Sequence, residues 1–380
     1  MRPTTHHDDH GDDHRFMGMA LDLARRGLGN VWPNPAVGCV VVRDGRHVVG
    51  RGWTRPGGRP HAETEALKRA GGRALGATAY VTLEPCSIYG HTPPCTMALL
   101  HAGVRRVVAA AVDPDPRVDG RGIEQLRQAG VRVELGLRGA EAEALNAGFF
   151  KRLRVGLPLV TLKLATSLDG RIATRTGASR WITGPAARAR GHHLRATHDA
   201  IMIGSGTALA DDPELTCRLP GMADRSPVRV VLDGRLRLSA EAKLVRTATA
   251  APTWLVTAAD IPERRRAPLE RAGVTLIEVP AAPGGGLSLP EALGALARRG
   301  ITRLLVEGGG TLAAALLRAR LVDRVVWFHA PLVIGADGLA AVAGFGVESL
   351  AEAAGLRRIG SEELEDDTAT TYIPAGDGED

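Results

Sequence analysis

Aromatic residues and lysine are both scarce in this chain of 380 residues. Phe, Trp and Tyr together make up 3% of the sequence, too few for the stacked aromatic surface that binds single-stranded nucleic acid. Lysine occurs only at Lys68, Lys151, Lys163 and Lys243, so arginine supplies nearly all of the basic charge behind the formal net charge of +6. Because the arginines are scattered among Ala and Gly, we expect a solvated Arg-rich surface and no nucleic-acid partner. A few of them can instead meet a substrate phosphate.

Long apolar runs are also absent. No run approaches the roughly 20 residues needed to cross a bilayer. Residues 1–15 contain no apolar segment after a basic start, which a signal peptide would have. We therefore expect a cytoplasmic protein with no membrane partner.

Cysteine is rare, with four residues in the chain. In a cytoplasmic protein so few cysteines argue against a disulfide framework and for metal binding or catalysis by some of them. Cys39 lies within the apolar run AVGCVVV and is expected in the core, and Cys217 has no companion ligand nearby. Cys86 and Cys95 remain as candidates for chemistry.

The chain is too long for one ordinary core, and its length predicts two or three domains. Residues 1–12 are rich in His and Asp and are expected to be a disordered tail rather than a metal site. Strands and helices alternate over residues 13–152, which is typical of an α/β sheet covered on its faces. A composition break follows, with a linker at 153–158, and the alternation restarts in a second α/β domain at 159–375.

Apolar periodicity locates the elements of each domain. In the first domain we expect helices at 15–27, 61–70, 95–103 and 123–130, and strands at 37–42, near His47, and at 77–84, 105–113 and 131–136. In the second we expect helices at 185–196 and 311–319, a surface loop at 281–287, and strands at 159–165, 200–206, 228–234, 253–257, 303–309 and 324–330.

Three metal-ligand residue types stand at element ends in the first domain. His61 opens a predicted helix, Cys86 follows a predicted strand, and Cys95 opens the next helix. One imidazole and two thiolates leave the fourth position of a tetrahedral zinc open for water, which is the arrangement of a catalytic site. Water bound there loses a proton near neutral pH. Glu63, two residues after the first ligand, is placed to take that proton and return it to a departing amine.

Other interpretations of these residues remain open. A helix-start histidine and two buried cysteines are common without a metal, although three such residues at element ends favour the site. The H-x-E and P-C signature is typical of nucleobase deaminases, whose cysteines stand two residues apart. Here eight residues, SIYGHTPP, separate Cys86 from Cys95. This spacing argues against a cytidine-type or polynucleotide deaminase with an accessory binding domain, which would bind single strands with a steep salt dependence.

The second domain carries weaker signals. Glu307 ends a strand, a triple glycine follows, and Thr311 starts a helix, so backbone amides could meet a phosphate there. A tight strand–helix connection explains the same pattern, which is not the fingerprint of a dinucleotide-binding Rossmann domain. Residues 204–218 gather charged side chains in one loop after a buried strand, which marks either a site or a solvated loop.

Together these segments resemble the bifunctional deaminase–reductase family of riboflavin biosynthesis. The resemblance covers about residues 13–375 in one order, and the eight-residue spacing of the cysteines fits it. The matching segments are PNPAVG (33–38), HAE (61–63), TLEPC (82–86), TPPC (92–95), KLATSLDGRIA (163–173), SRWITGPAAR (179–188), LRATHDAIMIGSGTALADDPELTCR (194–218) and VEGGGTLAAALL (306–317).

The resemblance implies an N-terminal cytidine-deaminase-like zinc domain and a C-terminal dihydrofolate-reductase-like domain that uses NADPH. The first domain would remove the 2-amino group of 2,5-diamino-6-(5-phosphoribosylamino)pyrimidin-4-one, and the second would reduce the ribosyl side chain of the product to ribityl. Asn34 would hydrogen-bond the pyrimidine. We also expect a homo-oligomer formed through the reductase domain.

Site residues of the reductase follow from the same resemblance. Arg195 and Arg218 suit a ribose phosphate because guanidinium groups bind it through paired N–H donors. Asp211, Lys163 and Glu307 are the candidates for proton transfer. The residues expected to contact NADPH are Ala165, Trp181, Thr207, Asp211, Gly309, Gly310, Thr311 and Leu312. Those expected to contact substrate are Lys163, Ser179, Arg195, Leu215, Arg218 and Glu307.

The chain departs from the family at three positions near the first site. Thr54 stands where the family usually has a histidine before HAE, and Ile88 and His91 stand where it usually has His and then Arg or Lys. The loop positions are expected near the ribose phosphate, so these departures affect phosphate contacts rather than the chemistry. An alternative is a chain in which these changes have disabled deamination and only reductase or scaffold function survives.

Overall fold

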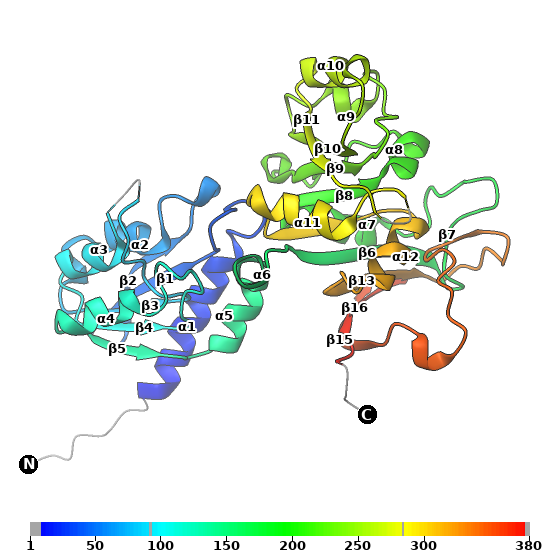
Figure 1. The fold of residues 1–380 in the computed structure, drawn as a ribbon. Coiled ribbons are helices and arrows are strands. Elements are labelled where there is room, and N and C mark those ends of the chain that lie inside the picture. Colours follow the sequence, from blue (N-terminus) through cyan, green and yellow to red (C-terminus); the bar gives the residue numbers. More distant parts are fainter. Residues whose placement is uncertain (1–8, 91–92, 283–284, 377–380) are drawn as a thin grey trace, which may run out of the picture. The chain divides into compact units, whose positions relative to one another are not determined.

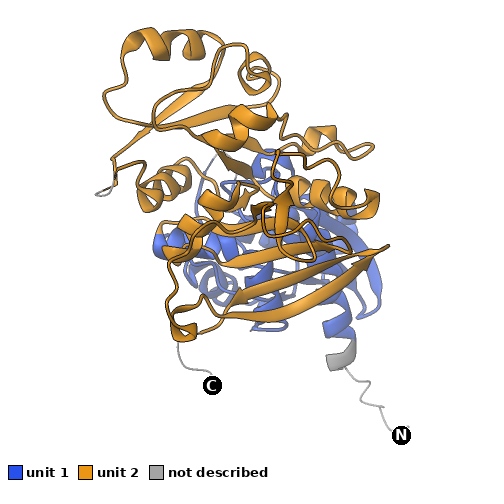
Figure 2. Ribbon diagram, turned by 90° about the vertical axis from the view of Figure 1, so that its right-hand side faces the viewer, with its two compact units in different colours: residues 1–155 blue, residues 156–380 orange. Residues whose placement is uncertain are grey.

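In the computed structural model, residues 9–90, 93–282 and 285–376 are described, and the chain divides into two compact units. The first unit is Met1–Val155 and the second is Gly156–Asp380 (Figure 2). The last helix of the first unit, α6 (Ala147–Val155), includes residues 153–155, which were expected in the linker. The basic sequence there suggested a linker, but Phe149 and Phe150 bury the helix against the core of the first unit.

A five-stranded mixed sheet forms the centre of the first unit (Figure 1). Its strand order is β2-β1-β3-β4-β5. β1 pairs antiparallel with β2 and β3, whereas β3, β4 and β5 run parallel. The strands are β1 (Gly38–Arg43), β2 (His47–Trp53), β3 (Thr78–Val81), β4 (Arg106–Ala109) and β5 (Arg132–Leu135). The other helices of this unit are α1 (Asp9–Arg25), α2 (Ala62–Ala70), α3 (Cys95–His101), α4 (Arg121–Gln128) and α5 (Gly139–Leu145).

Helix α1 packs its predicted apolar stripe into the core of the first unit. Phe16, Met17 and Leu21 are at most 1% exposed, as expected for side chains that repeat every three or four residues. The helix begins at Asp9, so residues 9–12, expected in the disordered tail, are helical. Residues 1–8 of that tail lie outside the described residues.

The second unit is built on a nine-stranded sheet in the order β11-β10-β9-β8-β12-β6-β13-β16-β15. Strands β11 through β13 in this order are parallel, and β16 and β15 add antiparallel pairs at one edge. The strands are β6 (Leu159–Ser167), β8 (Ala200–Gly204), β9 (Val228–Leu232), β10 (Thr253–Ala258), β11 (Thr275–Val279), β12 (Arg303–Val306), β13 (Arg324–Ala330), β15 (Leu356–Leu364) and β16 (Asp367–Pro374). β7 (Arg171–Ala173) and β14 (Leu339–Ala340) form a separate two-stranded sheet.

Helices connect the parallel strands of the second unit, which is the crossover that parallel strands require. They are α7 (Pro185–Ala196), α8 (Ser205–Asp211), α9 (Lys243–Arg246), α10 (Glu263–Arg271), α11 (Leu289–Arg298) and α12 (Gly310–Arg318). Both halves therefore have the α/β architecture expected from the sequence. The parallel arrangement also brings the carboxyl ends of β6, β8 and β12 to one edge, where ligands bind in such sheets.

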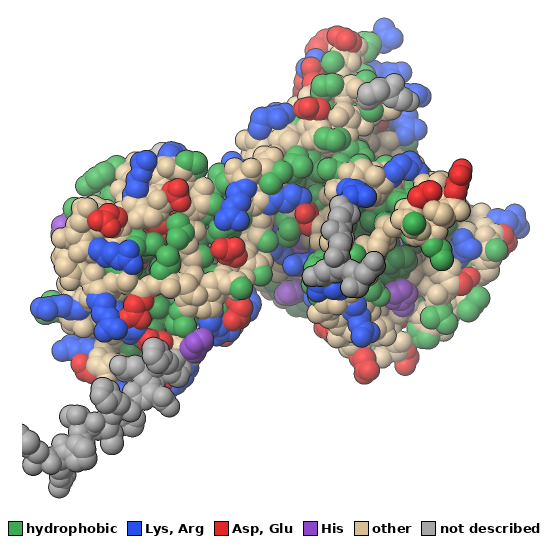
Figure 3. All heavy atoms as spheres, turned by 60° about the horizontal axis from the view of Figure 1, so that its bottom comes forward, with side chains coloured by type: hydrophobic (Ala, Val, Ile, Leu, Met, Phe, Trp, Pro, Cys, Tyr) green, Lys and Arg blue, Asp and Glu red, His purple; other side chains and the backbone are tan. Residues whose placement is uncertain are grey.

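Within the described ranges, every helix is too short or too polar to cross a bilayer. On the face shown in Figure 3, Lys and Arg side chains are scattered among acidic and apolar ones over both units. This distribution agrees with the solvated Arg-rich surface expected from the composition.

Candidate functional site

Three predicted metal ligands converge in the first unit. Nδ1 of His61 lies 3.3 Å from Sγ of Cys95 and 3.6 Å from Sγ of Cys86. The three ligand atoms all lie within 4.8 Å of one another. Tetrahedral zinc, with bonds of about 2.0 Å to nitrogen and 2.3 Å to sulfur, holds such atoms about 3.6 Å apart. The donor set and its spacing therefore fit a zinc ion bound by all three residues.

Helix starts and one loop place these ligands. His61 precedes α2 as its N-terminal cap residue in extended conformation, and Cys95 is the first residue of α3. Cys86 follows β3, and the backbone N–H of Cys95 donates to its Sγ at 3.4 Å. Hydrogen bonds from the Cys95 and His61 side chains and from this N–H lower the pKa of Cys86 to about 4, which favours the thiolate that binds metals.

Glu63 lies beside the ligand cluster and is 4% exposed. Burial raises the pKa of its carboxyl group to about 7, although the neighbouring His61 opposes that change. The side chain also contacts Cys95 through a hydrogen bond. A buried carboxyl group with a pKa near neutrality can both take and give a proton at working pH.

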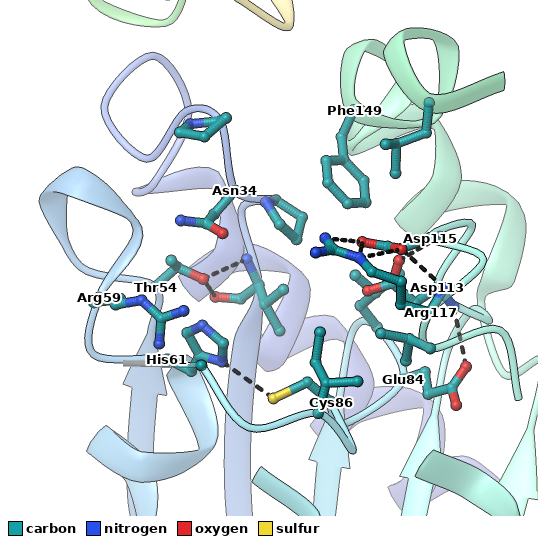
Figure 4. Close-up of a pocket in the computed structure, with 18 of the residues that line it drawn as sticks. Asn34, Thr54, Arg59, His61, Glu84, Cys86, Asp113, Asp115, Arg117 and Phe149 are labelled. Atoms are coloured by element: carbon teal, nitrogen blue, oxygen red, sulfur yellow. Dashed lines mark hydrogen bonds and ion pairs between the residues drawn. The ribbon is translucent and has the colours of Figure 1, made fainter. Parts of the chain in front are cut away.

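The metal-ligand cluster opens into a cavity of about 380 Å³ (Figure 4). Asn34, Thr54 and Ile88 line this cavity together with His61, Glu63 and Cys86, so the structure brings most of the predicted first-site residues together. Thr54 also has a structural part, because its Oγ1 accepts a hydrogen bond from the N–H of Val37 at 3.0 Å. His91 lies outside the described residues.

Sequence reasoning missed several residues of this cavity. Glu84, in the TLEPC segment, accepts hydrogen bonds from four backbone N–H groups at 2.8–3.3 Å and so fixes the chain from Asp113 to the start of α4. Asp115 forms an ion pair with Arg117 at 2.6 Å. The remaining lining residues that were not predicted are Pro33, Pro35, Val37, Arg59, Leu83, Tyr89, Gly90, Asp113, Val118, Phe149, Arg152 and Leu153.

In the second unit a carboxylate joins two cations from different elements. Glu307, which follows β12, forms a bidentate pair with Arg195 of α7 at 2.8 and 2.9 Å. Nζ of Lys163, on β6, lies 3.9 Å from the same carboxylate. Arg195 also donates to the carbonyl of Thr216 at 3.1 Å, which ties this group to the 212–218 segment.

The charged groups of this cluster shift one another's pKa values. Burial raises the pKa of Glu307, but Arg195 and Lys163 outweigh it and hold the pKa at about 2. Burial lowers the pKa of Lys163, an effect that Glu307 opposes. Glu307 is therefore ionised at neutral pH, whereas Lys163 loses its proton more readily than an exposed lysine.

Two adjoining pockets of about 540 and 490 Å³ hold most of the predicted reductase residues. Ser179, Trp181, Arg195 and Arg218 line both pockets. Lys163, Ala165 and Glu307 line the first. Asp211 and Leu215 line the second.

The predicted glycine turn lies beside the carboxyl end of β8 and outside these two pockets. The N–H of Gly309 donates to Oγ1 of Thr207 at 3.1 Å, which joins the starts of α8 and α12. Gly309 is the N-terminal cap residue of α12, whose first residues are Gly310, Thr311 and Leu312. Thr207 and residues 309–312 thus meet each other, although they are absent from the lining of either pocket.

Sequence reasoning missed two further residues of the reductase pocket. His192 lines the pocket one helical turn before Arg195, and its Nδ1 accepts the backbone N–H of Arg218 at 3.3 Å. The guanidinium of Arg188 lies 4.7 Å from the centre of the Trp181 ring. Trp181 is 66% exposed, so its ring does not fill the core. The spacing of His192 and Arg195 on α7 was the only available signal for the histidine.

Known families match both units. The family model for the cytidine and deoxycytidylate deaminase zinc-binding region matches residues 10–111, and the model for the RibD C-terminal domain matches residues 158–370. The riboflavin biosynthesis protein RibD of Bacillus amyloliquefaciens is 42% identical over 96% of this chain and 97% of its own length. RibD of Escherichia coli K12 is 45% identical over 90% of this chain and 94% of its own length.

Solved structures agree with these relatives over the full chain. Acinetobacter baumannii RibD has a TM-score of 0.86 at 38% identity and covers 96% of this chain and 99% of its own. A diaminohydroxyphosphoribosylaminopyrimidine deaminase/5-amino-6-(5-phosphoribosylamino)uracil reductase from Thermotoga maritima has a TM-score of 0.84 at 33% identity. The match covers 97% of this chain and 100% of the Thermotoga chain. The chain therefore belongs to the RibD family, the bifunctional enzymes of riboflavin biosynthesis that join a zinc-binding deaminase domain to a reductase domain.

Proposed function

We propose that the first unit hydrolytically deaminates 2,5-diamino-6-(5-phosphoribosylamino)pyrimidin-4-one and that the second unit reduces the ribosyl group of the product to ribityl with NADPH. One observation carries the first half of this proposal. His61, Cys86 and Cys95 form a three-ligand cluster beside the buried carboxyl group of Glu63, at a cavity that Asn34 also lines. Three ligands leave a fourth position for water, as a hydrolytic site requires.

In the deaminase site, His61, Cys86 and Cys95 would hold the metal. Zinc, when bound, supplies the Lewis acidity that makes water nucleophilic near neutral pH. Glu63 takes a proton from the attacking water and returns it to the amine that leaves as ammonia, and its raised pKa suits both transfers. Asn34 orients the pyrimidine through its side-chain amide.

In the reductase site, the cluster around Glu307 binds the substrate. Arg195 and Arg218 would hold the ribose phosphate, with Lys163, Ser179, Leu215 and Glu307 as further substrate contacts. NADPH, when bound, supplies the hydride. The residues that would contact it are Ala165, Trp181, Thr207, Asp211, Gly309, Gly310, Thr311 and Leu312. The backbone N–H groups at the start of α12 suit the cofactor's phosphates.

Lys163 is the proton donor we propose for the reduction. Glu307, with a pKa of about 2, has no proton to give at neutral pH. Asp211 lines the neighbouring pocket and not the one that contains the Glu307 cluster. Lys163 is partly buried, its Nζ lies 3.9 Å from the Glu307 carboxylate, and burial lowers its pKa, so it can protonate the ribosyl oxygen that is released when the hydride reaches C1.

We further propose a cytoplasmic homo-oligomer that assembles through the reductase unit and binds neither nucleic acid nor membranes. β15 is the edge strand of the nine-stranded sheet, and residues 357–363 along it are exposed. An exposed edge strand is a ready surface for pairing with a second chain. Sedimentation of the full chain over a range of concentrations tests this assembly.

The proposed function is tested by incubating the zinc-loaded chain with the diaminopyrimidine phosphate, with and without NADPH. Ammonia and NADPH absorbance are followed separately. We expect one ammonia per substrate in both cases, and one NADPH oxidised per ammonia when the cofactor is present. NADPH oxidation without ammonia release would support the alternative in which only the reductase survives.

A further inference from the structure

The deaminase cavity has two walls of different charge. Its carboxylates other than Glu63 are Glu84, Asp113 and Asp115, which come from the segments after β3 and β4. On that wall Asp115 pairs with the guanidinium of Arg117 through contacts of 2.6–3.2 Å. The charge of Arg117 is therefore largely balanced within the protein, and Arg152, which also lines the cavity, interacts with the same carboxylate of Asp115. The carboxylates of this wall repel a phosphate.

Arg59 lies on the opposite wall. Figure 4 shows its side chain next to His61 and Thr54, on the side of the cavity that carries Asn34, and across from Asp113, Asp115 and Arg117. Apart from Glu63 beside the metal ligands, the described residues of this wall contribute no carboxylate to the cavity. A dianionic phosphate at Arg59 would thus meet a guanidinium without approaching the acidic wall.

Local packing fixes the position of Arg59. The N–H of Gly57 donates to the carbonyl of Asn30, and the N–H of Arg55 donates to the carbonyl of Pro60, so the 55–60 loop is closed and held against the 30–34 turn. A Cβ at Gly58, whose φ is +83°, would lie 1.9 Å from the side-chain nitrogen of Asn34. The loop therefore holds Arg59 at a fixed position relative to Asn34, the residue proposed to orient the pyrimidine.

Gly90, which has no side chain, lies next to the guanidinium of Arg59 and leaves room for it. A Cβ at Gly90 would lie 3.2 Å from Nη2 of Arg59. The end of the Arg59 side chain thus reaches from the loop before α2 to the loop that joins Cys86 to α3. It lies beside His61 on the cavity wall (Figure 4), so a group tethered through a ribose to a pyrimidine bound at the metal ligands could extend to it.

We infer that Arg59 is a specificity-determining residue of the deaminase site, which binds the 5-phosphate of the substrate and selects it over the unphosphorylated ribosyl compound. This inference rests on the proposed function of the first unit. A guanidinium suits the task because it presents paired N–H donors to phosphate oxygens. Because the phosphate is remote from the reacting carbon, the contact acts mainly on KM and little on kcat.

The test compares two substrates, the diaminopyrimidine phosphate and its dephosphorylated ribosyl counterpart, by ammonia release without NADPH. For Arg59→Met we expect kcat/KM to fall about 10- to 100-fold for the phosphate, as for loss of a charge-assisted contact, and by less than about threefold for the dephosphorylated compound. Arg59→Lys should recover part of the preference. Zinc content per chain, measured by metal analysis, should stay equal to that of the wild type in both variants.

Two further variants locate the effect. Arg51→Met removes the same charge from an exposed position of β2 and should leave both substrates unchanged. Arg117→Met, on the acidic wall, should leave the ratio between the substrates unchanged. The assignment is overturned if both Arg59→Met and Arg59→Lys keep the wild-type ratio of kcat/KM between the two substrates. It is also overturned if that ratio is lost in Arg117→Met instead. If the wild type deaminates neither compound, the proposed function itself fails, and that outcome is distinct from either result.

Discussion

At the scale of single residues, each site depends on one carboxylate whose surroundings set its charge. Glu63 is buried where desolvation dominates, which raises its pKa to about 7. Glu307 is partly buried, with 12% of its side chain exposed, but Arg195 and Lys163 hold its pKa at about 2. The first carboxyl group can exchange protons near neutral pH, whereas the second stays ionised and positions cations. We therefore propose proton transfer by Glu63 and substrate positioning by Glu307.

Substitution of Glu63 should separate metal binding from chemistry. In Glu63→Ala and the isosteric Glu63→Gln, we expect zinc content per chain to remain at the wild-type level. Ammonia release should fall by about 10²- to 10⁴-fold, because the loss is that of acid–base assistance. Glu65→Gln, on the same helix but paired with Arg55, serves as the control and should retain activity. Retained deamination in Glu63→Gln would remove this residue from the mechanism.

The ionisation of Glu307 makes stability depend on pH in acid. Its pKa is lowered from 4.5 to about 2, so its contribution is complete above about pH 4.5 and is lost as the pH falls toward 2. We expect Glu307→Gln to lower the free energy of unfolding by up to about 3 kcal/mol at pH 7. The difference from the wild type should shrink steadily between about pH 5 and pH 3 in denaturant titrations. A difference that is constant over this range would contradict the assigned charge state.

At the scale of elements, Glu84 connects β3 to the start of α4. The carboxylate is 3% exposed and accepts hydrogen bonds from the N–H groups of Asp113, Gly120, Gly122 and Ile123. These groups lie in the loop that supplies the acidic wall of the deaminase cavity. The TLEPC segment therefore carries Cys86 of the candidate metal cluster and, two residues earlier, the anchor of the facing loop.

Removal of this anchor should destabilise the first unit. Glu84→Ala leaves buried N–H groups without an acceptor, at about 1–3 kcal/mol each, so we expect the free energy of unfolding to fall by at least about 3 kcal/mol. Glu84→Gln keeps one acceptor oxygen and should cost less. Glu143→Ala, an exposed glutamate of α5, is the control. Thermal and denaturant unfolding of the full chain measure the difference, and equal stability of Glu84→Ala and Glu143→Ala would refute the anchoring role.

Elements with strong periodicity could be predicted from the sequence. The helix at 185–196 and the strand at 324–330 have the expected bounds, because local apolar spacing determines both. The three residues of the candidate metal cluster could also be predicted to lie together, since each stands at an element end. α6 was wrongly placed in part within a linker, because its anchoring residues Phe149 and Phe150 precede the basic stretch that dominates the composition there.

Contacts between distant segments could not be predicted. Glu84 bonds residues 29–39 positions away, and Arg59 meets Gly90 through the packing of two loops. His192 reaches the reductase pocket only because α7 packs beside the 212–218 segment. Such contacts depend on the folded arrangement, and no periodicity or motif in the sequence shows which distant segment each residue meets.

At the scale of the whole molecule, each unit forms its pockets from its own residues. The deaminase cavity is lined entirely by residues of Met1–Val155, and the two reductase pockets by residues of Gly156–Asp380. The metal ligands also belong to the first unit alone. The two activities should therefore be separable within the intact chain by removing the metal.

Zinc removal from the full-length protein is the most direct test of this account. After chelation we expect no ammonia from the diaminopyrimidine phosphate, while 5-amino-6-(5-phosphoribosylamino)uracil should still support NADPH oxidation at the rate of the zinc-loaded protein. Added zinc should restore ammonia release. Undiminished ammonia release from the metal-free chain would contradict the account, because the cluster of His61, Cys86 and Cys95 would then not be the centre of the first reaction.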